Sequence, residues 1–64
     1  ATAVLNGANE AAVGLFLENR IGFLQIAELV EAALDAVPWQ ANPGLSDILA
    51  ADRAARQAVF QNLR

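Results

Sequence analysis

The first third of the chain is apolar on nearly every side when its residues are placed at helical spacing, and this property most limits how the chain can fold. At 100° per residue the apolar side chains form two neighbouring stripes, comprising Leu5, Ala8, Ala12 and Phe16 and, beside them, Val4, Ala11 and Leu15. A helix of this kind is normally buried nearly all round. Because 64 residues form one small domain with a limited core, we expect some apolar surface to face a neighbour.

Helical periodicity recurs in two further stretches, and no strand alternation longer than a few residues is present. The predicted helices cover residues 6–18, residues 25–37 and a third stretch from residue 46 towards the C-terminus. The second of these is clearly amphipathic, with its acidic residues on one side. The predicted fold class is therefore all-α, a small bundle of three main helices with room for a short fourth turn.

The helix boundaries are predicted from capping and helix-breaking residues. Asn6 is a good N-cap for the first helix, and Thr2 is an alternative cap that would start the helix a turn earlier. Pro38 ends the second helix, because proline cannot continue the backbone hydrogen-bond pattern. The third helix starts near Ser46, just after the Pro43-Gly44 turn.

The two connecting segments carry large apolar residues. In residues 19–24 we expect Ile21 and Phe23 to fold inward. In residues 38–44 we expect Trp39 to serve as a packing anchor, since a lone tryptophan in a small domain more often fills a core than binds a ligand.

Composition excludes several classes of function. The chain has no cysteine and no histidine, so a disulfide framework, thiolate chemistry and an imidazole metal site are ruled out. We therefore expect no catalytic, cofactor-binding or metal-binding residue. The net charge is −3 and no basic stripe exists, which argues against nucleic acid as a partner. No apolar run approaches the roughly 20 residues that span a bilayer, so no membrane association is expected.

A polar cluster interrupts the apolar pattern at two places. Asn6, Asn9 and Glu10 lie at the head of the first predicted helix, beside apolar neighbours. Asp52 and Arg56 fall inside the apolar arc of the third, at the i,i+4 spacing of a helical ion pair. Polar groups beside apolar surface require partners. We therefore predict that these five residues form a structural polar clamp between the first and third helices.

One motif carries a family resemblance. Residues 5–13 read Leu-Asn-Gly-Ala-Asn-Glu-Ala-Ala-Val, which resembles the Leu-Asn-Ala-Ala-Asn-Glu motif of 1-deoxy-D-xylulose 5-phosphate reductoisomerase. The likeness continues, in the family's order and spacing, through residues 16–17, 20–26, 45–49 and 51–56. Gly7 stands where alanine is commoner in the family. Gln25 stands where aspartate is commoner, which is expected to weaken the start of the second helix.

The resemblance implies that residues 1–64 are a single C-terminal helical domain, a fragment of a larger enzyme. That enzyme converts 1-deoxy-D-xylulose 5-phosphate to 2-C-methyl-D-erythritol 4-phosphate with NADPH and a divalent metal, magnesium or manganese, in the non-mevalonate pathway of isoprenoid biosynthesis. The family implies a homodimeric, cytoplasmic bacterial parent. Its cofactor-binding, metal-binding and substrate-binding residues all precede the region matched here.

The expected role of this segment is thus structural: it has no active site and its partner is the catalytic domain of the same parent chain. The alternative is a free-standing helical interaction or dimerisation module that uses the same apolar surplus. An independent enzyme is opposed by the missing histidine, cysteine and metal cluster.

Overall fold

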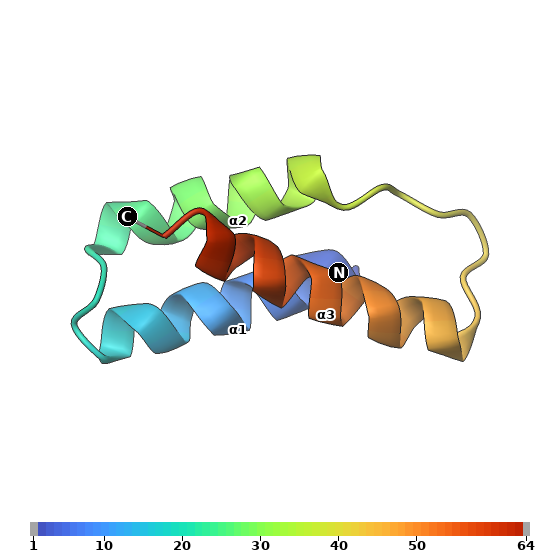
Figure 1. Ribbon diagram of the computed structural model, residues 1–64, viewed down its shortest axis with the longest axis horizontal. Helices are drawn as coiled ribbons and strands as arrows, with labels where there is room; N and C mark the ends of the chain where they lie inside the picture. Colours follow the sequence, from blue (N-terminus) through green and yellow to red (C-terminus); the bar gives the residue numbers. More distant parts are fainter. Residues whose placement is uncertain (1, 64) are drawn as a thin grey trace.

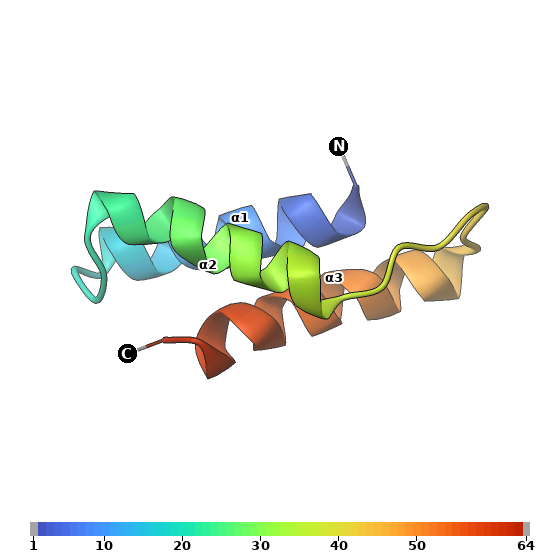
Figure 2. The same cartoon turned by 90° about the horizontal axis from the view of Figure 1, so that it is seen from above.

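The computed structural model describes residues 2–63 and contains three helices in an up-down-up arrangement, as Figure 1 shows. They are α1 (Ala3–Leu17), α2 (Phe23–Ala36) and α3 (Leu45–Gln61). Helix α2 runs antiparallel to the other two, and α3 crosses the α1–α2 pair at an angle (Figure 2). The prediction of a small all-α bundle is confirmed, although no fourth helix occurs within residues 2–63.

The helix starts differ from the predicted ones because the capping groups differ. Thr2, the alternative cap, is the N-cap of α1, and its hydroxyl oxygen accepts the backbone N–H of Leu5 at 3.1 Å. The expectation that Asn6 caps α1 is wrong, because Asn6 already lies one turn inside the helix and its N–H bonds to the carbonyl of Thr2.

Helices α2 and α3 both begin after a glycine. At each start, the side chain of the third helical residue accepts the backbone N–H of the glycine: Gln25 from Gly22 at 2.8 Å, and Asp47 from Gly44 at 3.0 Å. In a capping box, the side chain of the third helical residue accepts the backbone N–H of the N-cap residue, and this half of the motif is present at both helix starts. Helix α3, predicted to start near Ser46, begins one residue earlier, at Leu45. Gln25, which was expected to weaken the start of α2, instead provides a capping bond.

The turn after α1 is a Schellman motif. Asn19 has φ 62°, its N–H bonds to the carbonyl of Phe16, and the N–H of Arg20 bonds to the carbonyl of Leu15. This turn directs the next residue, Ile21, into the core, where its exposed fraction is 7% as predicted.

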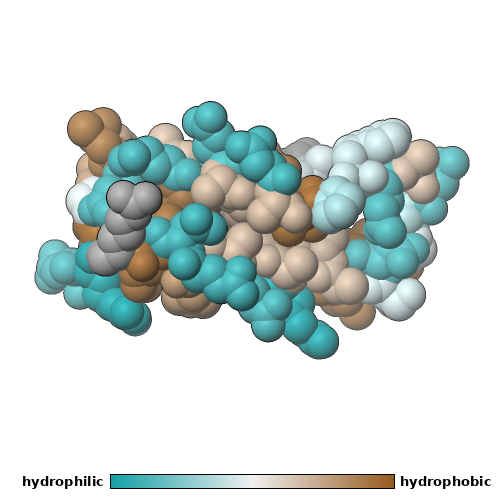
Figure 3. Space-filling model, turned by 45° about the horizontal axis from the view of Figure 1, so that its top comes forward, coloured by the Kyte–Doolittle hydropathy of each residue, from teal (hydrophilic) through white to brown (hydrophobic). Residues whose placement is uncertain are grey.

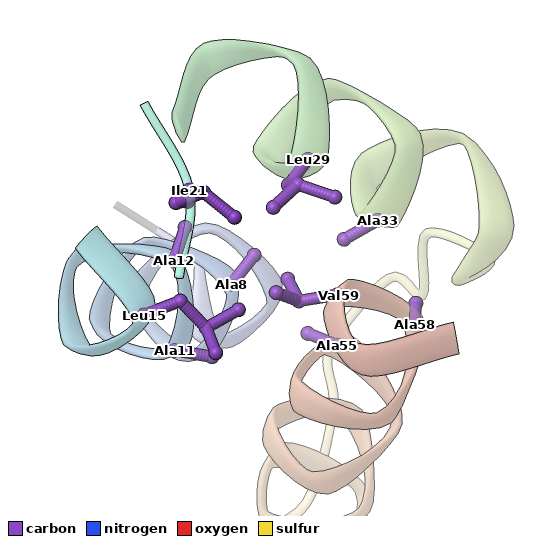
Figure 4. Packing of buried hydrophobic residues seen from close by; sticks show 10 residues of the cluster. All are labelled: Ala8, Ala11, Ala12, Leu15, Ile21, Leu29, Ala33, Ala55, Ala58 and Val59. Atoms are coloured by element: carbon purple, nitrogen blue, oxygen red, sulfur yellow. The ribbon is translucent and has the colours of Figure 1, made fainter. Parts of the chain in front are cut away.

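The core is built largely from alanine. Figure 4 shows side chains from all three helices and from Ile21 converging on one centre. Val59 is the largest side chain that is fully buried. The core comprises Ala8, Ala11, Ala12, Leu15, Ile21, Leu29, Ala33, Ala55, Ala58 and Val59.

The large apolar residues lie mainly outside this core. Phe23 is 72% exposed and Trp39 is 80% exposed, so the predictions that these two side chains fold inward are wrong. Phe23 makes only an edge-to-face contact with Phe16, with ring centroids 5.8 Å apart. Figure 3 shows strongly hydrophobic surface between bands of hydrophilic residues.

The shape explains this exposure. The molecule is elongated, with principal extents of 36 × 19 × 17 Å, and its accessible surface is 4502 Å². A compact monomer of 6.7 kDa is expected to expose about 3,900 Å². Small residues let the three helices pack closely, but they leave little interior volume in which aromatic and leucine side chains could be buried.

Candidate functional site

A single guanidinium group joins α1 to α3. Nε of Arg56 donates to Oδ2 of Asp52 at 3.0 Å, one turn earlier on α3, and Nη2 donates to Oε2 of Glu10 on α1 at 2.7 Å. The exposed fractions of these side chains are 39% for Arg56, 35% for Asp52 and 68% for Glu10. The two ion pairs therefore lie at the solvent edge of the α1–α3 interface.

The electrostatic environment favours the charged form of Arg56. Its pKa is raised above the ordinary value, first by the hydrogen bond to Asp52 and then by the one to Glu10. Because the raised pKa belongs to a cation, the stabilisation is fully present below arginine's ordinary pKa and is lost only in strongly alkaline solution. Across the physiological pH range this contribution is constant.

Helices α1 and α3 approach one another closely beside this group. A Cβ atom placed on Gly7 of α1 would lie 2.6 Å from Oδ1 of Asp52 and 2.9 Å from its backbone carbonyl oxygen. A side chain larger than hydrogen at Gly7 would therefore require α1 and α3 to separate. Gly7 allows the contact, and Arg56 bridges the helices next to it.

The two asparagines of the predicted clamp lie elsewhere. Asn6 and Asn9 are both exposed, and within residues 2–63 neither side chain makes a hydrogen bond. The structure thus brings together Glu10, Asp52 and Arg56 but leaves Asn6 and Asn9 to solvent. Both asparagines border apolar grooves, but because their side chains are exposed, water can satisfy their hydrogen-bonding groups without a protein partner.

Two kinds of feature are absent from the described part of the chain. No group of three or more histidine, cysteine, aspartate or glutamate side chains within residues 2–63 could hold a metal ion. None of the helices in this part of the chain is long and apolar enough to cross a membrane.

A second feature, an apolar groove of about 800 Å³, lies between the start of α1, the end of α2, the connector and the start of α3. We call it the Trp39 groove. Its apolar walls include Val4, Leu34, Val37, Trp39, Ile48 and Leu49.

The groove adjoins a continuous exposed segment. Every residue from 38 to 50 is exposed, even though this stretch contains Trp39, Leu45, Ile48 and Leu49. Figures 1 and 2 show the reason: the connector and the first turns of α3 extend beyond the N-terminal end of α1.

Sequence reasoning missed the Trp39 groove, because it assigned Trp39 to the core. A usable signal was present. The connector of residues 38–44 and the first turn of α3 together carry large apolar residues, while the small residues that bring helices together lie elsewhere in the chain.

Comparison with known proteins connects this architecture to a family. The sequence-family model described as the DXP reductoisomerase C-terminal domain matches residues 1–58. The chain is 61% identical over 61 residues to the 1-deoxy-D-xylulose 5-phosphate reductoisomerase of Burkholderia multivorans, covering 95% of this chain and 15% of that protein. No solved structure matches the chain significantly.

More distant relatives agree. The chain is 56% identical over 57 residues to the reductoisomerase of Burkholderia cenocepacia, covering 89% of this chain and 14% of that protein. It is 48% identical over 60 residues to that of Caldanaerobacter subterraneus subsp. tengcongensis, covering 94% of this chain and 16% of that protein. The chain thus spans about 15% of the length of the curated relatives that it matches. It belongs to the DXP reductoisomerase C-terminal domain family.

Proposed function

We propose that this chain is a non-catalytic structural domain, docked against the catalytic domain of a 1-deoxy-D-xylulose 5-phosphate reductoisomerase. The observation that carries the proposal is the inverted distribution of apolar residues, with alanines inside and large side chains outside. Large exposed apolar surfaces mark interaction sites. Because the matched relatives are several times longer than this chain, the remainder of the same polypeptide is the nearest available partner.

The proposed activity of the whole protein follows from its family. It would convert 1-deoxy-D-xylulose 5-phosphate to 2-C-methyl-D-erythritol 4-phosphate with NADPH and magnesium or manganese, as a homodimer in the bacterial cytoplasm. The residues described here do not fit the metal, since no cluster of ligating side chains exists among them. We therefore assign no chemical step to this segment.

Its contribution would be to hold the catalytic domain in shape. Within the domain, Glu10, Asp52 and Arg56 are proposed to fix α1 against α3, so that the exposed apolar side chains keep a defined arrangement. An exposed ion-pair network of this kind adds little stability, but its hydrogen bonds are directional and set the relative position of two helices.

Three samples test the proposal: the whole reductoisomerase carrying this domain, the same protein without it, and this chain alone. NADPH oxidation is followed with substrate and metal present. We expect turnover from the whole protein, none from this chain alone, and loss of activity together with a lower melting temperature in the truncated protein. Turnover by the chain alone would overturn the non-catalytic role, and unchanged activity and melting after truncation would overturn the supporting role.

A further inference from the structure

We propose that the Trp39 groove is the face by which this domain docks onto the remaining part of its own reductoisomerase chain. The inference rests on the proposed function and goes further by choosing one surface, one anchor residue and the chemistry of the surface that binds there.

The first argument is the lack of any partner within the domain. Trp39, in the connector, is 80% exposed, and Leu45 and Leu49, in the first turns of α3, are 74% and 58% exposed. Figure 2 shows the connector and these first turns extending beyond α1. No other helix of the described chain reaches this overhang. Tryptophan is among the residues most enriched at the energetic hot spots of protein interfaces.

The second argument concerns which polypeptide lies near. Most of the length of the curated relatives lies outside the matched stretch, and the matched domain is C-terminal. Thr2, Ala3 and Val4 line the Trp39 groove. Polypeptide that precedes this domain in the whole protein therefore joins it beside the rim of the groove. A tethered surface binds at high effective concentration, which favours it over any free partner.

The third argument is charge. The groove lining contains two acidic residues, Asp47 and Asp52, and no basic one; Asp52 is already paired with Arg56, so Asp47 is the acidic group in the lining without an ion-pair partner among the described residues. A complementary surface therefore presents aliphatic side chains flanked by arginine or lysine. A second copy of this domain is a poor match, because its own groove is acidic and the chain carries a net charge of −3.

A second exposed apolar surface lies at the opposite end, where Phe23 and Leu24 begin α2. It continues along α2 as a smaller groove of about 500 Å³ whose apolar walls include Ile26 and Val30. Phe23 already contacts Phe16, and the neighbouring residues 19–20 are polar, so this surface offers the weaker apolar anchor. This surface supplies a matched control, since Leu24 is as exposed as Trp39 but lies outside the Trp39 groove.

The test measures thiol accessibility in the whole reductoisomerase that carries this domain. The domain contains no cysteine, so Leu49→Cys, Ile48→Cys and the control Leu24→Cys each introduce one thiol into it. Labelling rates are compared with those of the same variants of this chain alone, with the unsubstituted proteins as background. We expect Leu49→Cys to label about tenfold more slowly, or slower still, in the whole protein, because the docked state opens only transiently. Ile48→Cys is a second probe of the same surface, for the case in which Leu49→Cys itself weakens docking.

Further arms separate the alternatives. Trp39→Ala added to Leu49→Cys should restore fast labelling, while leaving the rate at Leu24→Cys unchanged. Protection of Leu49→Cys that increases with protein concentration would show a second copy in the groove and would overturn the inference. Fast labelling at Leu49→Cys and Ile48→Cys with protection at Leu24→Cys would overturn it too, yet leave the proposed docking of the domain intact. Fast labelling at all three positions would overturn both.

Discussion

At the scale of single residues, Asn19 occupies a demanding backbone position, as does Asn42. The Asn19 φ of 62° lies in the left-handed region, which asparagine and glycine tolerate better than other residues. The Schellman turn that it allows reverses the chain after α1 and places Ile21 in the core. A local backbone preference at one position therefore determines how the second helix meets the first.

A substitution at Asn19 tests this point. Asn19→Val should destabilise the chain by about 1–2 kcal/mol, because a β-branched side chain clashes in the left-handed region. Asn19→Gly is the matched control and should be neutral or slightly stabilising. Urea unfolding monitored by circular dichroism gives both values. Equal stability of the valine and glycine variants would show that the turn does not require this conformation.

Arg56 acts at the same scale through charge. It bonds to carboxylates on two helices, and all three side chains are partly exposed. Its contribution should therefore weaken as salt screens the charges, since the Debye length falls to about 3 Å at 1 M.

The prediction concerns the difference in unfolding free energy between the natural chain and Glu10→Gln. This difference should be small at low salt and should vanish at molar salt, where the ion pair is screened. Glu31→Gln, on the exposed face of α2, is the control and should show no such salt-dependent loss. A difference that persists unchanged at molar salt would contradict the surface-edge location of the bridge.

At the scale of elements, the structure depends on how closely α1 and α3 approach. Gly7 leaves room for Asp52, whereas a Cβ atom at Gly14 would have no neighbour within 4 Å. Two glycines in one helix therefore have different roles, one required by packing and one not.

Alanine substitution separates these roles. Gly14→Ala should stabilise the chain by about 0.5–1 kcal/mol through helix propensity alone. Gly7→Ala makes the same gain but overpacks the interface, at a cost of about 1–3 kcal/mol. Its net effect should be a loss of up to about 2 kcal/mol. Thermal or urea unfolding of both variants measures the contrast, and equal stabilisation by the two would show that α1 and α3 separate without cost.

The elements also show what sequence reasoning can reach. The three helices were predictable because their apolar periodicity is strong and because Pro38 and Gly22 interrupt it. Their first residues were less predictable, because the caps of α2 and α3 combine a glycine N–H with a side chain three residues later. Such a cap depends on a side-chain conformation that no single residue type specifies.

The site was only partly predictable for a related reason. The pairing of Asp52 with Arg56 follows from their i,i+4 spacing. The bond from Arg56 to Glu10 follows from the rule that a charged group beside apolar surface needs hydrogen-bond partners. Trp39 and Phe23 were assigned to the interior because large apolar residues are normally buried. That rule fails here because alanines fill the core and leave little interior volume for large side chains.

At the scale of the whole molecule, the chain has a small-residue core and a large-residue surface. The alanine core gains little from burial, because each alanine removes little apolar area from water. The side chains that could contribute most, those of Trp39, Leu45 and Phe23, remain exposed. We therefore expect the domain to gain stability when an outside surface covers them.

Hydrogen exchange of the core amides tests this central claim most directly. The rates of residues 8–12 and 55–59 are compared in this chain alone and in the whole reductoisomerase that carries it. Docking should slow their exchange by about 100-fold or more, which corresponds to about 2.7 kcal/mol of added stability. Equal exchange rates in the two proteins would show that the domain is complete without a partner, and would contradict the account.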